Sequence, residues 1–117
     1  MVSIRDANII KHIDSYCDEI RECISWFKNP FEAILKYHWF KDCLAMKLYQ
    51  ISESAQHLTD DFTKEHGNMP WRTIKGLRVV YAHRYKTLDL EQMWGTIPDG
   101  IPELKQFCRD IAIESKY

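Results

Sequence analysis

The amino-acid sequence predicts an all-α protein, a bundle of four to five helices in a single domain that spans residues 1–117. Apolar residues recur at steps of three and four over several long segments, which is the period of an α-helix. Glycine and proline number only four each, too few for a sandwich or barrel with many tight turns. No segment alternates apolar and polar residues for long enough to form a useful strand. A chain of this length can bury a core without disulfides or metals.

The first helix is expected over residues 6–27, where one apolar stripe runs for about six turns. Asn29-Pro30 should end it, because a proline steers the preceding residue away from helical angles. The stripe consists of Ile9, Ile10, Ile13, Tyr16, Cys17, Ile20, Cys23, Ile24 and Phe27.

A short helical piece is expected over residues 31–36 and a second long helix over residues 37–59. A turn that contains Asp60, Asp61 and Gly67-Asn68 should follow and lead to Pro70, a residue suited to the first turn of a helix that begins near Trp71. The stripe of the second long helix is Phe40, Leu44, Leu48, Ile51, Ala55 and Leu58.

The third helix contains Gly76, which costs about 1 kcal/mol relative to alanine in a helix interior. We therefore expect Gly76 to permit the close approach of another helix or chain. Asp89 is a plausible N-cap for a fourth helix through Trp94. Ile97-Pro98-Asp99-Gly100 reads as a turn, and Pro102 should open a last helix that runs to about Ser115.

The four cysteines and five histidines show no spacing typical of a metal site, so no metal or cofactor is expected. Cys17, Cys23 and Cys43 lie in helical stripes and are interpreted as small core residues. The start of the chain lacks the apolar run of a signal peptide, and no segment has the ~18 apolar residues needed to span a bilayer. These features predict a reduced, cytoplasmic protein with no membrane partner.

Positive charge is concentrated between His66 and Leu88. This segment has five basic residues and no acidic one, whereas the rest of the chain has eleven basic against seventeen acidic residues, a net charge of −6. The five are Arg72, Lys75, Arg78, Arg84 and Lys86, and His83 and Tyr85 lie among them. Such a cluster can attract phosphate, although a solvated helix face is the simpler interpretation of a charge run alone.

Two arrangements could bring Arg78 and His83 to one phosphate. In a continuous helix the two residues lie about 140° apart around the axis, so they would not converge. If the helix ends near Ala82 and the chain then extends, His83 and Tyr85 project to the same side. Alternatively, two copies of the helix in a symmetric dimer could line one groove. The sequence leaves both arrangements open.

This set of residue types suits the cleavage of RNA. The 2′-hydroxyl next to each phosphodiester is a built-in nucleophile, so cleavage needs an acid and base near pH 7 and donors for the developing charge. His83 offers the first and Arg78 the second. The flanking Arg72, Lys75, Arg84 and Lys86 are candidate phosphate contacts, and no metal is required.

The ordered segments Pro70-Trp71, Gly76-Leu77-Arg78 and His83-Arg-Tyr85 resemble the signature of the HepT-like branch of the HEPN superfamily. That signature is an Arg, four to six residues, a His, any residue and a Tyr. Ile51-Ser-Glu53-Ser-Ala55 is similar to the family's Ile-Gly-Glu-Ala-Ala segment. Residues 89–94 and 102–104 are similar to its closing helix, so the resemblance covers most of the chain.

The resemblance implies a HEPN-like bundle that homodimerises, with the two Arg-x4-His motifs facing each other in an interface cleft. It implies a metal-independent endoribonuclease toxin, paired with a small antitoxin of the nucleotidyltransferase fold. By position, Arg78 and His83 would be catalytic and Tyr85 would accept AMP from the antitoxin. An AMP group would bring negative charge and bulk into a basic cleft.

Three positions depart from the family pattern. Val79 follows the motif Arg where a polar residue is common, Ser52 replaces a Gly, and Arg84 adds a charge after the motif His. The alternative is therefore a non-catalytic, degenerate HEPN module that binds a nucleotide or a nucleotidyltransferase partner. A helical DNA-binding protein is a weaker option, because the net charge is −1. Glu53 is a candidate for holding a basic residue of the central segment in place.

Overall fold

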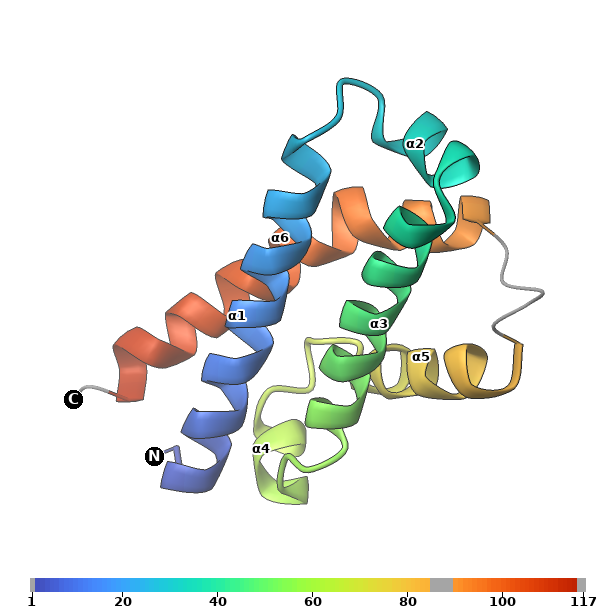
Figure 1. Ribbon diagram of the computed structural model, residues 1–117. Helices are drawn as coiled ribbons and strands as arrows, with labels where there is room; N and C mark the ends of the chain where they lie inside the picture. The colour runs from blue at the N-terminus through green and yellow to red at the C-terminus, as the bar shows by residue number, and fades with distance from the viewer. Residues whose placement is uncertain (1, 85–89, 116–117) are drawn as a thin grey trace.

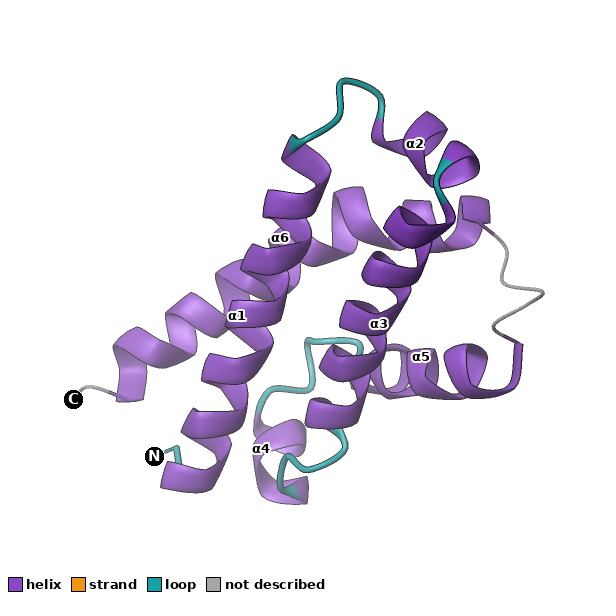
Figure 2. Ribbon diagram, viewed as in Figure 1, coloured by secondary structure: helices purple, strands orange, loops and turns teal. Residues whose placement is uncertain are grey.

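A computed structural model describes the backbone of residues 2–84 and 90–115 and the side chains of residues 2–77 and 97–114. Within these ranges the chain forms six helices and no strand (Figures 1 and 2), which confirms the prediction of an all-α fold. The helices are α1 (Ile4–Ser25), α2 (Pro30–Lys36), α3 (His38–Ala55), α4 (Asp60–Glu65), α5 (Trp71–Arg84) and α6 (Leu90–Ser115).

The four longer helices make the bundle. Helices α1 and α3 run antiparallel and side by side, with α6 packed on α1 and α5 packed on α3 (Figure 1). The short α2 connects α1 to α3 at one end, and α4 follows α3 at the other. The core is filled by the expected helical stripes, including the fully buried Ile13, Cys17, Ile20 and Leu44.

Helices α1 and α2 start at side-chain caps. The Ser3 hydroxyl accepts a hydrogen bond of 3.0 Å from the Asp6 amide, and Asn29 Oδ1 accepts one of 3.1 Å from the Glu32 amide. Such bonds satisfy amides that have no partner inside the helix. The expected helix over residues 6–27 is therefore present with both ends shifted by two residues, and Pro30 opens α2.

Part of the expected turn after α3 is wrong, because residues 60–65 form the helix α4. Its N-cap is Thr59, whose hydroxyl accepts a hydrogen bond of 3.2 Å from the Phe62 amide. Asp60 and Asp61 occupy the first turn, where negative charge is favourable, and Phe62 is buried in the core. The cap and the acidic pair were the signals available in the sequence.

The expected turn at residues 97–100 is also wrong, because α6 continues through Pro98 and Pro102. Each proline lacks the amide that a helix interior uses. The cost is offset by an apolar stripe that crosses both prolines without a break and packs against α1. This stripe is Ile97, Ile101, Leu104, Cys108 and Ile111, all at most 4% exposed. The proposed cap Asp89 lies outside the described residues, and so does the side chain of Trp94.

Two of the three cysteines assigned to the core lie at its edge. Cys17 is fully buried, as expected, whereas Cys23 and Cys43 are half-buried and face each other across α1 and α3. Trp71 is buried as a core anchor, but Trp39 is 63% exposed and is not part of the core.

Candidate functional site

The start of α5 is anchored by aromatic side chains. Trp71 is buried and its Nε1 donates a hydrogen bond of 3.0 Å to the His66 carbonyl. Its ring lies 5.5 Å from the Phe107 ring and 6.1 Å from the Phe62 ring, measured between centroids. Because these partners come from α4, α6 and the turn before α5, they fix where the basic helix begins.

The middle of α5 is held to α3 through a backbone carbonyl. The Ser52 hydroxyl donates a hydrogen bond of 2.8 Å to the Lys75 carbonyl, and Gln56 Nε2 donates one of 3.1 Å to the same oxygen. Ser52 is fully buried. Because two donors one turn apart on α3 bind the same oxygen, they fix the distance of α5 from α3 and the rotation of α5 about its own axis next to Gly76.

Ser52 and Gln56 were not identified as site residues from the sequence. The available signal was a pair of polar residues, four apart, beside the apolar stripe of α3. Ser52 occupies a position where the family that the sequence resembles usually has glycine. Glycine has no hydroxyl and could not donate this hydrogen bond.

The basic side chains of α5 that the structure describes have no counter-charge among the other described side chains. Arg72 is exposed and Lys75 is half-buried, and neither forms an ion pair with any part of the chain whose side chains are described. Their positive charge is therefore available to an external anion.

Helix α5 continues through His83 to Arg84. The arrangement in which the helix ends near Ala82 is therefore wrong, and positions 78 and 83 are about 140° apart around one helix axis. The side chains of Arg78, His83 and Arg84 are not among those described, while Tyr85 and Lys86 lie outside the described residues altogether. The roles of all five residues remain predictions.

The periodicity of α5 places positions 78 and 83 on different faces. Position 78 is four residues after the buried Ile74, about 40° away on the side that packs in the bundle. Position 83 is nine residues after Ile74, about 180° away. Arg72, Gly76 and position 83 fall within about 40° of one another, so they share a second face, which we call the outer face of α5.

Gly76 on the outer face has open space around it. A Cβ atom built there would meet no described atom within 4 Å. The expected close approach is therefore not made by any described helix of the same chain, and an approach by a second chain stays a prediction.

Glu53 is half-buried on α3, one residue after Ser52, and its role toward the basic segment stays a prediction. No group of three or more His, Cys, Asp or Glu side chains in the described ranges could hold a metal ion. Among the described helices, none combines the length and apolar character that crossing a membrane requires.

Comparison with known proteins finds a family and relatives whose names all refer to ribonucleases. A family described as "Ribonuclease HepT-like" matches residues 13–111. The chain is 27% identical to "Putative RNase TTE0752" of Caldanaerobacter subterraneus subsp. tengcongensis, over 92% of this chain and 94% of the relative. It is 28% identical to "Probable ribonuclease HepT" of Thermococcus cleftensis, over 77% of this chain and 86% of that protein. No solved structure matches the chain.

Proposed function

This chain belongs to the HepT-like ribonuclease family, and we propose that it is a metal-independent endoribonuclease whose active site forms between two copies of the chain. The observation that carries the proposal is the outer face of α5, on which Arg72, Gly76 and position 83 follow one another along the helix. This face combines the positive charge of Arg72, which is unpaired among the described side chains, room for close approach at Gly76 and, by helix periodicity, sequence position 83. A two-fold axis beside it would bring two such faces together.

A dimer would bring the motif residues of two chains to one cleft. In a symmetric pair that meets through the outer faces, the two copies of position 83 would line the cleft, and each Arg78 would reach it with its long side chain from the edge of the interface. The cleft would then hold two guanidinium and two imidazole groups around one phosphodiester. The exposed Arg72 and the half-buried Lys75 would extend the positive surface along the RNA backbone.

In the proposed reaction one His83 imidazole removes the proton of the 2′-hydroxyl, and the 2′-oxygen attacks the adjacent phosphorus. The bond to the 5′-oxygen breaks as a protonated His83 gives that oxygen a proton. The products are a 2′,3′-cyclic phosphate and a 5′-hydroxyl. Arg78 stabilises the charge that develops on the non-bridging oxygens, for which its planar fork is suited.

Cleavage of a labelled RNA tests this function. His83→Ala and Arg78→Ala should each lower the rate by at least about 100-fold, the usual contribution of a general acid–base group or of an oxyanion donor. Circular dichroism and light scattering should show an unchanged helical dimer. A substrate with a single 2′-deoxy sugar at the cleaved position should resist the wild type, because it lacks the nucleophile.

The alternative function is a non-catalytic module that binds a nucleotide or a nucleotidyltransferase partner. Val79, in place of the polar residue common after the motif Arg, is the observation that favours it. This alternative would replace the nuclease if the pure dimer left RNA intact, or if the wild type and His83→Ala cleaved equally.

We further propose that the protein is the toxin of a toxin–antitoxin pair in the cytoplasm, silenced when a cognate nucleotidyltransferase transfers AMP to Tyr85. Co-expression with that partner should add about 329 Da to the peptide that contains Tyr85 and abolish RNA cleavage. Tyr85→Phe should remain unmodified and active in the same cells. Inhibition of Tyr85→Phe to the same extent would show that the partner acts without this modification.

A further inference from the structure

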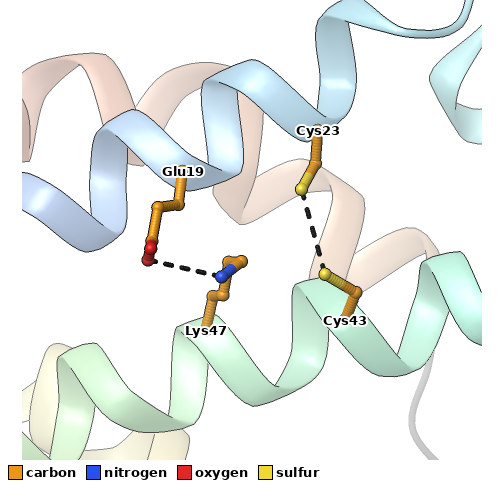
Figure 3. A network of polar contacts seen from close by, with 4 residues as sticks. All are labelled: Glu19, Cys23, Cys43 and Lys47. Atoms are coloured by element: carbon orange, nitrogen blue, oxygen red, sulfur yellow. Dashed lines mark hydrogen bonds and ion pairs between the residues drawn. The ribbon is translucent and has the colours of Figure 1, made fainter.

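Helices α1 and α3 are joined by matched pairs of side chains one turn apart (Figure 3). The Lys47 ammonium lies 3.3 Å from a Glu19 carboxylate oxygen. One turn further along α1, and one turn back along α3, the Sγ atoms of Cys23 and Cys43 are 3.8 Å apart. The antiparallel packing of two long helices therefore fixes the register that brings these thiols together.

The same register continues for one more turn. Phe27, four residues after Cys23, meets Trp39, four residues before Cys43, with ring centroids 6.1 Å apart. The thiols thus lie between an ion pair on one side and an aromatic contact on the other. A disulfide requires about 2.05 Å between the sulfur atoms, so each thiol would need to shift by about 1 Å.

A groove makes this pair accessible from outside. Its volume is about 350 Å³, and its lining includes both thiols and the exposed Trp26 and Trp39, which are 78% and 63% exposed. The remaining lining residues are Phe27 and Phe40. A small oxidant can therefore reach Cys23 and Cys43 without opening the core.

The other two thiols provide a contrast inside the same molecule. Cys17 and Cys108 are 0% and 1% exposed. Burial raises the pKa of Cys17 to about 12 and also raises the pKa of Cys108. The thiolate is the reactive form, so these two cysteines should be inert in the folded protein.

We propose that Cys23 and Cys43 form a modification site that a hydroperoxide converts into a disulfide between α1 and α3. In the first step one sulfur attacks the peroxide, so that an S–O bond forms, the O–O bond breaks, and the leaving oxygen takes the thiol proton. In the second step the other sulfur attacks the sulfenic acid, the S–S bond forms, and the hydroxyl leaves as water. Two thiols and one hydroperoxide thus give a disulfide, an alcohol or water, and one further water.

Both thiols line the groove, so each can take either role. Burial and the hydrogen bond with Cys43 raise the pKa of Cys23. Whichever thiol forms the sulfenic acid, the other lies close enough to resolve it. The disulfide would close a loop that contains α2 and would join the two helices at the groove.

Treatment of the full chain with hydrogen peroxide tests the proposal. The count of free thiols should fall from four to two, and the intact mass should fall by about 2 Da, the mass of two hydrogens. A non-reducing digest should contain one cross-linked species, Cys23–Cys43. The midpoint of thermal unfolding should rise by about 10 °C, the scale expected for one disulfide in a chain of this size.

Single variants separate the steps. Cys23→Ser and Cys43→Ser should each stop at a sulfenic acid on the remaining groove cysteine, which dimedone traps, with no loss of mass. A disulfide between chains, a linkage that includes Cys17 or Cys108, or four free thiols after treatment would overturn the proposal. Because RNA cleavage plays no part in these readouts, the proposal stands or falls separately from the proposed nuclease function.

Discussion

Helices α1 and α5 use their charges in opposite ways. On α1, Asp14 and Asp18 both pair with Lys105 of α6, and the Lys105 ammonium lies 2.8 Å from the Asp14 carboxylate. Glu19 pairs with Lys47 of α3. On α5, the described basic side chains have no such partner. These three carboxylates of α1 therefore stabilise the bundle, whereas Arg72 and Lys75 of α5 make no ion pair with a described side chain and are open to an external anion.

The difference also shows in how each helix is attached. The carboxylate of Asp6 on α1 accepts hydrogen bonds from the Thr59 amide and hydroxyl, at 3.0 and 2.7 Å, so a charged side chain is used as the link to α4. Helix α5 is held instead by its Lys75 carbonyl and by the Trp71 ring. Attachment through backbone and apolar groups leaves the charged ends of Arg72 and Lys75 without an ion pair among the described side chains.

The largest effect on stability is expected at the buried ammonium of Lys105, whose side chain is only 4% exposed. Replacing both Asp14 and Asp18 by alanine should lower the free energy of unfolding by about 3 kcal/mol, because a buried charge would lose its partners. Urea denaturation measures this loss. Adding Lys105→Met should restore most of it. As a matched control, Lys47→Ala removes the α3 partner of another acidic residue of α1 and should cost under about 0.5 kcal/mol, because that partner, Glu19, is 48% exposed.

The next effect depends on pH and concerns Asp6. Burial raises the pKa of Asp6, but the hydrogen bonds from Thr59 and Ser3 outweigh it and hold the pKa below the ordinary 3.8. A lowered pKa in the folded state means that the stabilisation is present above the unfolded pKa and is lost as pH falls through the folded pKa. Asp6→Ala should therefore cost about 2 kcal/mol at neutral pH, and much less near pH 2. An equal cost at both pH values would contradict this account.

Gly76 tests whether the outer face of α5 is covered by a second chain. In an isolated protomer Gly76→Ala should stabilise the helix by up to about 1 kcal/mol, since the added Cβ meets no described atom within 4 Å. If two α5 helices meet there, Gly76→Leu should shift the dimer toward monomer in light scattering while the helical content stays constant. A Gly76→Leu dimer of unchanged affinity would place the interface elsewhere.

The smallest effect on stability is expected for the double variant Arg72→Gln, Lys75→Gln. Without intramolecular partners, these changes should alter the free energy of unfolding by under about 0.5 kcal/mol. Binding of single-stranded RNA should weaken, and the slope of log K against log salt should fall by about 1.4 for two lost phosphate contacts. An unchanged salt slope would show that the two charges do not contact the RNA backbone.

The predictability of the fold varied with the kind of signal. The starts of α2 and α5 were predictable because Asn29-Pro30 and Pro70-Trp71 are local chain signals. The continuity of α6 through Pro98 and Pro102 was not predictable from local signals. It depends on an apolar stripe that stabilises the helix only when α1 packs against it. The candidate site divides in the same way. The basic composition of α5 can be read directly from the sequence. The hydrogen bond from Ser52 to the Lys75 carbonyl forms only when α3 packs beside α5, so it could not be predicted.

The sequence by itself determined the helical class, the positions of most helices and the concentration of positive charge between His66 and Leu88, because periodicity, capping and charge are properties of neighbouring residues. Only the tertiary structure decided which charges remain unpaired, which face of α5 is left open at Gly76, and which two of four similar thiols meet at a groove. These outcomes depend on the register between helices that are distant in the chain, and register is set when the side chains of both helices pack together.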